Sequence, residues 1–306
     1  MVRGEKICMP KIAFFASLLA VLLHCAWGNV SPAAEYQLQG ALVGKKLFYQ
    51  TGNEDSLPEI ARSYDIGFNA IVFANRDVDP FLPDPQRYIV IPAEWILPQV
   101  PIRQGIVINR AEMRLYLFSP AKAQSVTSFP VGVGDLSLDT PLGTYTVIEK
   151  IKNPAWHVPP SIKRERPHLP AVVPPGPDNP LGSHALRLSA RTLLIHGTNR
   201  PWGIGTRNTH GCIRLYEEDI VQLFGLVRTG ERVTIVHQPV KVAKNGDAVY
   251  LEVHDYYEDG RDLYGAALKV LSEKNLTSGV DLNKVLRASR ERSGVLVDVS
   301  KGGESR

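Results

Sequence analysis

The sequence predicts a mainly β protein in which a small α/β unit precedes the β-rich part and a small α+β unit follows it. From Gly105 to about residue 238, short β-branched and aromatic segments alternate with glycines and prolines, as in all-β domains. Helical patterns flank this region, before Pro92 and after Pro239. The chain has 306 residues, 44% of them apolar and 22% charged, so a globular protein of one large unit or two to three smaller ones is expected.

A basic start and a short apolar run mark the N-terminus. The run covers residues 12–23, which is about 18 Å as a helix against the ~30 Å core of a bilayer. Small residues at Ala26 and Gly28 suit a cleavage site, so residues 1–28 are predicted to be a secretory signal peptide. An uncleaved membrane anchor is the alternative, and a bulky preceding residue disfavours a lipoprotein site at Cys25.

Cleavage there would leave a single cysteine. Cys8 and Cys25 fall within the predicted signal peptide, and Cys212 is the third. A lone cysteine in an exported protein is either paired with another molecule or a free reactive thiol. Cleavage also lowers the formal charge from +4 to about +2, with both signs mixed along the chain, so nucleic-acid binding is not expected.

Residues 36–98 are predicted to form a small module of strand, helix, helix and strand. Pro58 and Glu59 open the first helix, residues 69–74 form the second, and residues 88–91 form the closing strand. The segments SLPEIARSYDI, FANRDVDP and IVIP resemble a LysM module, the small peptidoglycan-binding fold. GNEDS replaces the usual glycine–aspartate–threonine opening, so a docking module without sugar affinity is an equal alternative.

Residues 103–238 are predicted to form the β-rich unit. Strands are expected at residues 106–108, 114–118, 125–131, 144–151, 192–195 and 233–236. A helix with acids in its first turn is expected at residues 217–227. Residues 153–182 hold nine prolines and would form an ordered loop or lid. The appendage, residues 240–306, is expected to contain a strand at 247–253 and helices at 264–273 and 280–292.

The segment IHGTNRPWGIGTRNTHGCIR places a thiol among imidazoles. His196 ends an apolar strand, and the glycines after it allow the chain to fold back so that Cys212 comes within reach. In thiol catalysis the thiolate is the nucleophile, and a neighbouring imidazole removes its proton. His210 and Arg214 would add positive potential and lower the pKa of the thiol further. The backbone N–H groups of Gly211 and Cys212 are candidate donors to an oxyanion.

Other uses of the cysteine have to be weighed against a catalytic thiol. A zinc site would combine Cys212 with a histidine, drawn from His184, His196 and His210. No second cysteine and no tight ligand spacing support it, so no metal is expected. The thiol could also be inert core filling or half of an intermolecular disulfide. The polar, glycine-rich surroundings favour catalysis, because structural cysteines more often stand inside apolar runs.

The longer segment IHGTNRPWGIGTRNTHGCIRLYEEDI resembles the signature of L,D-transpeptidases with a YkuD-type catalytic domain. That signature has a histidine, a glycine-rich spacer, a serine or threonine, and then His-Gly-Cys. The resemblance extends to FPVGVGDLSLDTPLGTYTV and AVVPPGPDNPLGSHALRL, and so covers about residues 103–238. Some members carry asparagine two residues after the cysteine. Arg214 at that position is similar to the ErfK-like subgroup, which links an outer-membrane lipoprotein to the wall.

The resemblance implies a β-sandwich-like catalytic fold and roles for particular residues. Cys212 would be the nucleophile, His196 the proton donor and acceptor, and His210 a supporting residue. The Gly197 carbonyl would orient the imidazole, and the Gly211 N–H would serve the oxyanion. The candidate substrate-binding residues in the signature are Asn199, Trp202, Thr209 and Arg214.

The resemblance also implies a reaction. The thiol would attack the meso-diaminopimelate carbonyl of a peptidoglycan tetrapeptide stem and release D-alanine. An amine would then take the acyl group, either on another stem, which makes a 3→3 cross-link, or on a lipoprotein lysine. The protein would act in the periplasm without a cofactor, and carbapenems would acylate it.

Three competing functions follow from the same residues. An L,D-carboxypeptidase or other thiol hydrolase would differ only in passing the acyl group to water. A sortase also uses histidine, cysteine and arginine, but with a much longer separation between histidine and cysteine. A non-catalytic wall-binding protein would act through the LysM-like module alone.

Overall fold

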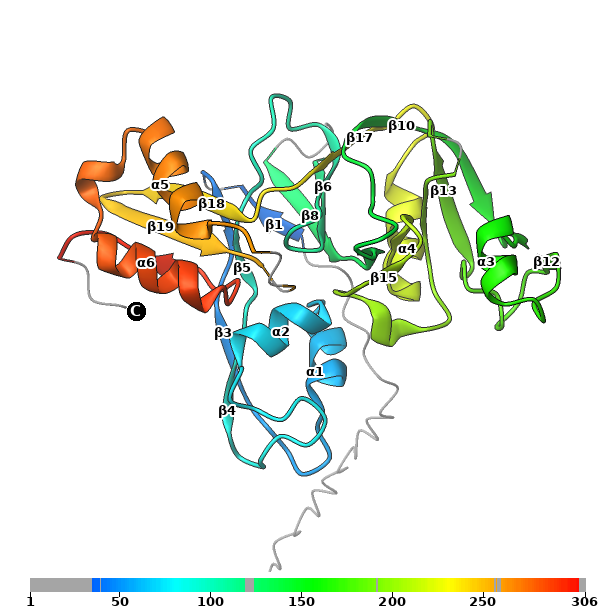
Figure 1. Ribbon diagram of the computed structural model, residues 1–306, viewed down its shortest axis with the longest axis horizontal. Helices are drawn as coiled ribbons and strands as arrows, with labels where there is room; N and C mark the ends of the chain where they lie inside the picture. The colour runs from blue at the N-terminus through cyan, green and yellow to red at the C-terminus, as the bar shows by residue number, and fades with distance from the viewer. Residues whose placement is uncertain are drawn as a thin grey trace, which may run out of the picture.

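The structure is a computed structural model that describes residues 35–38, 40–118, 124–190, 192–255, 257 and 260–302. The predicted signal peptide at residues 1–28, with Cys8 and Cys25, lies outside the described residues. Figure 1 shows an N-terminal module at the bottom, the β-rich unit at the centre and right, and a C-terminal unit at the left. No helix among the described residues is long and apolar enough to cross a membrane.

The β-rich unit is built on a nine-stranded mixed sheet, which confirms the mainly β prediction. The strand order is β1-β8-β7-β6-β17-β10-β13-β14-β16. These strands are β1 (Glu35–Gln37), β6 (Gly105–Asn109), β7 (Arg114–Phe118), β8 (Ser125–Pro130), β10 (Gly143–Lys152), β13 (His184–Leu188), β14 (Leu194–His196), β16 (Ile213–Arg214) and β17 (Arg232–Val236). β6 runs parallel to β17 and β14 parallel to β16, while the other neighbours are antiparallel.

Both faces of the β6–β7 hairpin are buried. Ile106 and Leu115 face the core of the β-rich unit, whereas Val107 and Tyr116 face a core shared with the N-terminal module. Successive side chains of a strand point to opposite faces, which explains this division. The helix α4 (Glu217–Leu226) covers the first of these cores with one apolar face.

The N-terminal module has its two helices where they were predicted, but two strands precede them and two follow them, against one predicted on each side. Its elements are β2 (Leu42–Gly44), β3 (Leu47–Gln50), α1 (Leu57–Ser63), α2 (Phe68–Ala74), β4 (Tyr88–Ile91) and β5 (Glu94–Ile96). Ser56 caps the start of α1, because its hydroxyl accepts from the Glu59 N–H at 3.4 Å and donates to the Glu59 carboxylate at 2.8 Å. One boundary differs from the prediction, because residues 35–37 pair with β8 and extend the nine-stranded sheet instead of joining the module.

The start of α2 docks the module onto the β-rich unit. The Phe68 N–H donates to the Ile204 carbonyl at 3.0 Å, and the next N–H donates to the Gly205 carbonyl at 3.3 Å. The first N–H groups of a helix have no partner within it, so the carbonyls of the other unit satisfy them. Gly67 packs against Gly205 so closely that a Cβ on either would overlap the backbone of the other.

The C-terminal unit is a hairpin covered by two helices. Its elements are β18 (Val240–Asn245), β19 (Ala248–Val253), α5 (Leu263–Glu273), α6 (Leu282–Glu291) and β20 (Val297–Asp298). They share an apolar core of their own. One strand and both helices lie where the sequence predicted them, and β18 and β20 are additional strands.

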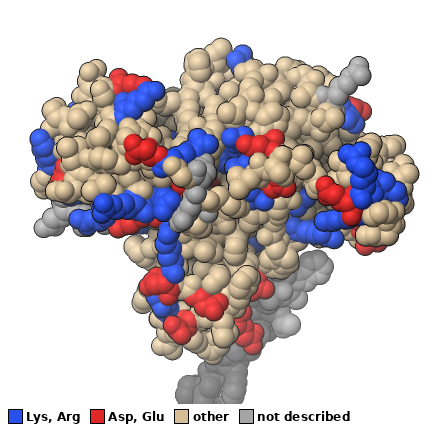
Figure 2. Space-filling model, viewed as in Figure 1, with Lys and Arg blue, Asp and Glu red and all other residues tan. Residues whose placement is uncertain are grey.

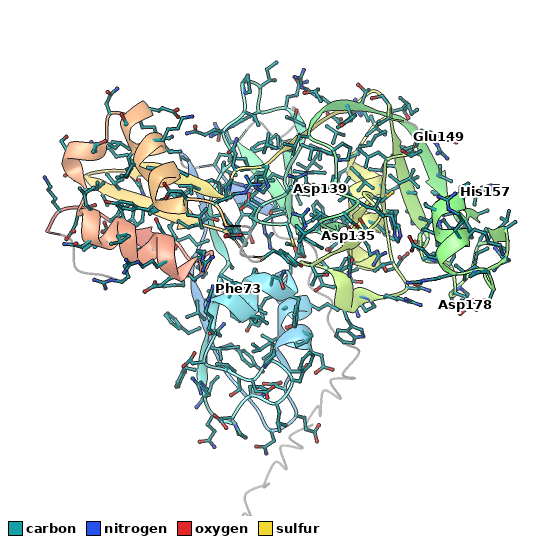
Figure 3. All side chains as sticks on the ribbon, viewed as in Figure 1. Phe73, Asp135, Asp139, Glu149, His157 and Asp178 are labelled. Atoms are coloured by element: carbon teal, nitrogen blue, oxygen red, sulfur yellow. The ribbon has the colours of Figure 1, made fainter. Side chains whose placement is uncertain are left out.

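The proline-rich segment is ordered, as predicted, and contains short elements. β11 (Trp156–His157) pairs antiparallel with β12 (Val172–Val173), and α3 (Pro160–Glu165) lies between them. The Asn179 amide donates to the Pro154 carbonyl at 2.8 Å and ties the two ends of the segment together. His157 and Asp178 mark this segment at the far right of the molecule (Figure 3), and we refer to residues 153–182 as the lid.

A buried cluster of charges joins the three units. The Lys241 ammonium donates to the Glu112 carboxylate and lies 3.1 Å from Glu252 Oε1. His254 Nε2 lies 2.5 Å from the same Glu252 oxygen. The Ile96 N–H, from β5 of the module, donates to Glu252 Oε2 at 2.6 Å. The cluster therefore links β5, the β6–β7 turn and the C-terminal hairpin.

Replacing Lys241 with methionine is expected to lower the free energy of unfolding by about 3–5 kcal/mol, because two buried carboxylates lose their ammonium partner. Lys244→Met, at an exposed position of the same strand, is the matched control. Urea unfolding followed by circular dichroism measures the difference. Equal midpoints for the two variants would contradict a stabilising role for the cluster.

A pair of buried carboxyl groups lies between the module and the β-rich unit. Asp65 follows α1, and Asp219 lies in the first turn of α4. Burial, followed by repulsion from Asp65, raises the pKa of Asp219 well above its usual value. The proton that Asp219 retains lets the two carboxyl groups share a hydrogen bond instead of repelling each other.

Asp219→Asn is expected to stabilise the protein near pH 8 by on the order of 1 kcal/mol, since the amide imitates the protonated acid. A raised folded-state pKa contributes stability that is present below the unfolded pKa and is lost as pH rises through the folded value. The gain from asparagine should therefore vanish near pH 4 and grow toward pH 8. Thermal unfolding across this range tests it, with exposed Asp247→Asn as control. A gain that does not change with pH would refute the assignment.

Candidate active site

Two short parallel strands bring the histidine and cysteine segments together. Ile195 stands opposite Ile213, and His196 stands opposite Arg214. Cys212 directly precedes β16, two residues before Arg214, so it extends on the same side of the strand pair as His196. The glycine-rich segment between them folds back on itself, which is the arrangement that its spacing predicted.

Two threonine hydroxyls hold the turn at the cysteine. Gly211 has a φ of +100°, a conformation that favours glycine. The Thr140 hydroxyl donates to the Gly211 carbonyl at 2.9 Å, and the Thr209 hydroxyl donates to the Cys212 carbonyl at 2.6 Å. The Gly211 N–H donates to Thr209 Oγ1 at 3.2 Å. The turn is therefore fixed from both sides before any substrate binds.

His196 is buried and its tautomer is determined by its neighbour. Nδ1 lies 2.6 Å from the Gly197 carbonyl oxygen. A carbonyl can only accept, so Nδ1 carries the proton of the neutral ring and Nε2 is the basic nitrogen. Burial, followed by repulsion from Arg214, lowers the pKa of His196 to about 3, while the hydrogen bond to Gly197 acts in the opposite direction. The ring is therefore neutral and able to accept a proton across the neutral pH range.

The thiol of Cys212 is protonated at rest. Burial raises its pKa and outweighs the lowering effects of the Leu194 backbone and of Arg214. The lowered pKa expected from the sequence is therefore wrong in its net direction, because desolvation of the thiolate dominates over the nearby arginine. The thiol donates to the Thr192 carbonyl at 3.5 Å and not to His196. The resting site therefore holds a neutral thiol and a neutral imidazole on the same side of the strand pair.

Arg214 lies between the imidazole and a cavity. Its backbone exchanges hydrogen bonds with Gly132 at 2.8 and 2.9 Å, and its guanidinium donates to Asn208 Oδ1 at 3.3 Å. Burial, followed by repulsion from Arg200, lowers its pKa. Arg214 Nε is buried and has no hydrogen-bond partner among the described residues, so the side chain has donor capacity to spare.

The cavity, of about 550 Å³, lies between the lid and the segment after β14. Its lining includes two tryptophans and three arginines, which are Trp156, Trp202, Arg166, Arg200 and Arg214. Asp178 is the acidic residue among the lining residues that the structure describes. Figure 2 shows Lys and Arg gathered at the right of the molecule, over the lid. The cavity therefore suits a ligand with apolar parts and more than one carboxylate.

The lid contacts the cysteine segment through His210. His210 Nε2 lies 3.5 Å from Glu165 Oε2 at the end of α3. His210 also lines the cavity, so it faces the lid and not the Thr140 side of the turn. The sequence does not show which of His196 and His210 lies closer to Cys212 in space. In the structure, His196 contacts the Gly197 carbonyl, whereas His210 contacts Glu165 of the lid.

The other predicted site residues lie either at the cavity or within the turn at Cys212. Asn199 and Trp202 line the cavity, and Trp202 is 58% exposed. Thr209 differs from its expected contact with substrate, because it is buried and its hydroxyl is used within the turn. The Gly211 N–H is likewise engaged by Thr209. The Cys212 N–H makes no hydrogen bond to a described residue, which leaves it available to an oxyanion.

Sequence reasoning missed Thr140 and Glu217. Thr140 precedes the β10 strand, about seventy residues before the turn that it holds, and nothing in its local sequence distinguishes it. Glu217 was predicted only as an acid in the first turn of a helix. Its carboxylate in fact accepts from the N–H groups of Ser183 and Thr198.

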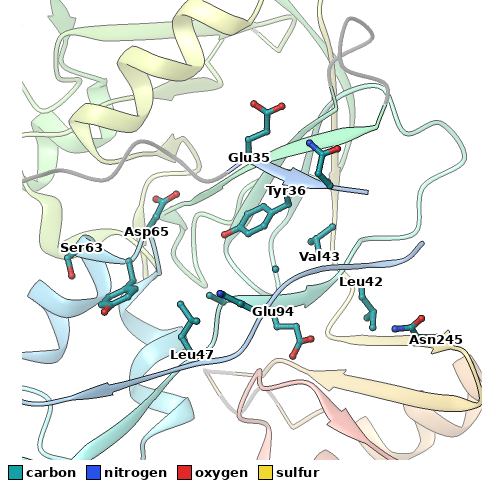
Figure 4. Close-up of a pocket in the computed structure, with 14 residues that line it drawn as sticks. Glu35, Tyr36, Leu42, Val43, Leu47, Ser63, Asp65, Glu94 and Asn245 are labelled. Carbon is teal, nitrogen blue, oxygen red and sulfur yellow. The ribbon is translucent and has the colours of Figure 1, made fainter. Parts of the chain in front are cut away.

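Two further features lie away from this site. A cavity of about 700 Å³ lies where β1, β2 and α1 meet, and it is lined by Glu35, Tyr36, Asp65 and Glu94 among others (Figure 4), with none of the predicted site residues. Among the described residues, Glu112, Glu252 and His254 have side-chain atoms close enough to share a metal ion. The Lys241 ammonium lies among them, and a cation there would be repelled by it.

Comparison with known families matches the central part of the chain to a catalytic domain. Residues 103–235 match the model of the L,D-transpeptidase catalytic domain, YkuD. The matched segment contains both His196 and Cys212, as well as the lid.

Similar curated proteins extend the match over most of the chain. The probable L,D-transpeptidase YcfS of Escherichia coli (strain K12) is 40% identical over 275 residues, which is 85% of this chain and 85% of that protein. The probable L,D-transpeptidase ErfK/SrfK of the same organism is 40% identical over 263 residues, 82% of this chain and 84% of that protein. The probable L,D-transpeptidase YbiS is 37% identical over 304 residues, 92% and 96% of the two chains.

Proposed function

The chain belongs to the L,D-transpeptidase family, and we propose on that basis that Cys212 and His196 perform its acyl transfer on peptidoglycan stem peptides. The observation that carries the proposal is the parallel pairing of β14 with β16. It places His196 opposite Arg214 and next to the strand extension that holds Cys212. A neutral thiol and a neutral imidazole then lie on one side of the strand pair.

In the first half-reaction the thiol proton passes to His196 Nε2 as Cys212 Sγ bonds to the meso-diaminopimelate carbonyl carbon of a tetrapeptide stem. The carbonyl oxygen becomes an oxyanion, and the Cys212 N–H is the available donor to it. The C–N bond to D-alanine then breaks, and the imidazolium returns the proton to the departing amine. The products are a thioester and free D-alanine.

In the second half-reaction an amine attacks the thioester. His196 removes the proton of the incoming amine, the C–N bond forms, and Cys212 leaves as a thiolate that takes back the proton. A stem diaminopimelate amine would give a 3→3 cross-link, and a lipoprotein lysine would give an anchored protein. Arg214 and the 37–40% identity to the ErfK, YbiS and YcfS proteins support a role within that group.

The lining of the cavity, which includes Arg214 and His210 but neither Cys212 nor His196, supports this choice of donor. Stem peptides carry several carboxylates, and Arg166, Arg200 and Arg214 outnumber Asp178 among the charges that line the cavity. We assign Arg214, Asn199 and Trp202 to substrate binding and His210 to a supporting role at the lid. Thr209 positions the cysteine turn. The lid limits access of water, which an acyl transfer to an amine requires.

The setting of the reaction follows from the same proposal. Peptidoglycan lies outside the inner membrane, so the protein would act in the periplasm after removal of residues 1–28. The LysM-like module would either bind glycan or serve as a docking unit. Its contacts with residues 204–205, which lie between His196 and Cys212 in the sequence, support at least the docking role.

Product analysis separates the transferase from a hydrolase. Purified protein is incubated with a disaccharide tetrapeptide, with and without a second stem or a lysine-ended peptide as acceptor, and the products are identified by mass spectrometry. The proposal expects an amide-linked product whose amount rises with acceptor concentration. Trimmed tripeptide stems as the sole product, at every acceptor concentration, would identify a carboxypeptidase instead.

A further inference from the structure

Glu217 is not among the residues that line the cavity assigned to substrate, and it lines a second cavity, of about 330 Å³, together with Thr198 and Asn199. Its Oε1 accepts from the Ser183 N–H at 2.8 Å, and its Oε2 accepts from the Thr198 N–H at 3.2 Å. Gly182 and Gly197 border the carboxylate, and a Cβ on either residue would overlap Oε2. The two glycines therefore leave a space that this carboxylate fills.

His196 and Glu217 each make a hydrogen bond to the same peptide unit, the one between Gly197 and Thr198. His196 Nδ1–H donates to the Gly197 carbonyl, and the N–H at the other end of the same amide is that of Thr198. The peptide is planar and trans, so its C=O and N–H point in opposite directions. A carboxylate that accepts from the N–H polarises the amide and makes its carbonyl a stronger acceptor.

We propose that Glu217 is a positioning residue that acts on His196 through the Gly197–Thr198 peptide, orienting the imidazole and stabilising its protonated form during acyl transfer. The inference rests on the proposed role of His196 as the base. When the thiol proton reaches Nε2, the ring becomes positively charged. Its Nδ1–H then donates a stronger hydrogen bond to the polarised Gly197 carbonyl. No bond forms or breaks at Glu217, and the proton returns by the route described above.

The charges around the imidazole make this support necessary. Burial and then Arg214 lower the pKa of His196, and the Gly197 hydrogen bond is the influence that raises it. Glu217 also acts on His184 of β13. Burial lowers the pKa of His184, and the Glu217 carboxylate opposes that effect without reversing it. The backbone around His196 is also fixed, because the Gly197 N–H donates to the His184 carbonyl at 3.1 Å. The Gly197–Thr198 peptide cannot rotate without breaking its hydrogen bond with His196 at one end and its hydrogen bond with Glu217 at the other.

Glu217→Gln tests the inference. An amide carries no charge and can accept from only one of the two N–H groups. At pH 7 and saturating donor, the acylation rate constant is expected to fall by about 10- to 100-fold, with KM changed by no more than about twofold. Glu218→Gln is the matched control, because it removes the same charge from the same helical turn but faces Arg62, at 2.8 Å. That variant should keep the wild-type rate constant.

A pH profile distinguishes this role from a purely structural one. Alkylation of Cys212 by iodoacetamide needs no donor substrate and reports on formation of the thiolate. Below the pKa of the thiol the imidazole must accept the proton, so Glu217→Gln should react more slowly than wild type. Above that pKa the proton has already left, and the two proteins should react at the same rate.

Three outcomes would overturn the inference. A loss of reactivity that is equal at every pH indicates a structural role, a rise in KM alone indicates a role in substrate binding at the cavity that Glu217 lines with Asn199, and a wild-type profile indicates no role. If Glu217→Gln fails to fold, hydrogen exchange in the wild type replaces it, and a Thr198 amide that exchanges like an exposed loop amide contradicts the proposed chain. Full activity in a His196→Gln variant would instead refute the base assignment, which separates the two proposals.

Discussion

Cys212→Ala is expected to abolish release of D-alanine from a tetrapeptide stem, because no thioester can form without the sulfur. A loss on the order of 10⁶-fold is typical when the nucleophile of a covalent mechanism is removed. Chromatography of released D-alanine measures the loss. The same variant should form no covalent adduct with meropenem, which would otherwise acylate the thiol.

The control for this variant is its fold. Cys212 is half-buried, and its backbone carbonyl accepts from the Thr209 hydroxyl, so alanine removes the sulfur without disturbing the turn. Cys212→Ser preserves the shape more closely and should also be inactive, since a serine hydroxyl beside a neutral imidazole is a much weaker nucleophile. A meropenem adduct on Cys212→Ala would place the reactive group elsewhere.

His196→Gln is expected to lower the acylation rate constant by about 10²- to 10⁴-fold, because the proposed acceptor of the thiol proton is lost. His210→Gln should have a much smaller effect, because His210 faces Glu165 of the lid. Single-turnover acylation with a tetrapeptide donor measures both variants. A larger loss at His210 than at His196 would reverse the two roles.

The pH dependence of the wild type follows from the same histidine. Its pKa of about 3 means that the imidazole becomes protonated, and so loses its basic nitrogen, only in strong acid. The acylation rate should therefore show no acidic limb from His196 between pH 5 and pH 7. A limb centred near pH 6.5 that disappears in His196→Gln would contradict the effect of burial on this ring.

The pairing of His196 with the cysteine segment could be predicted from sequence, because its determinants are local. An apolar run ending in histidine reads as a strand end, and glycines after it permit the return. The long strands β7 and β10 were equally evident from their β-branched and aromatic residues. By contrast, β16 has only two residues, and so short a strand leaves no periodic pattern to detect.

The electrostatics of the site could not be predicted, because they depend on burial. From sequence, Arg214 beside Cys212 suggests a lowered thiol pKa, yet desolvation in the folded protein outweighs that arginine. The hydrogen bond of the Gly211 N–H could not be predicted either. Its acceptor, Thr209, is two residues away, but only the folded turn shows that the two groups meet.

Long-range partners were also beyond sequence reasoning. Thr140 holds the Gly211 carbonyl from the start of another strand, and Glu217 reaches Ser183 across 34 residues. Neither contact has a spacing rule, since both depend on how the sheet brings β10, β13 and α4 together. The same holds for β1, which joins β8 across some ninety residues instead of packing with the module that follows it.

Intact-mass spectrometry of the protein mixed with a tetrapeptide donor tests the central claim most directly. We expect a mass increase equal to the donor minus D-alanine, located on the peptide that contains Cys212, and a return to the starting mass when an amine acceptor is added. An unmodified protein that nonetheless consumes the donor, or an adduct located on any residue other than Cys212, would contradict it.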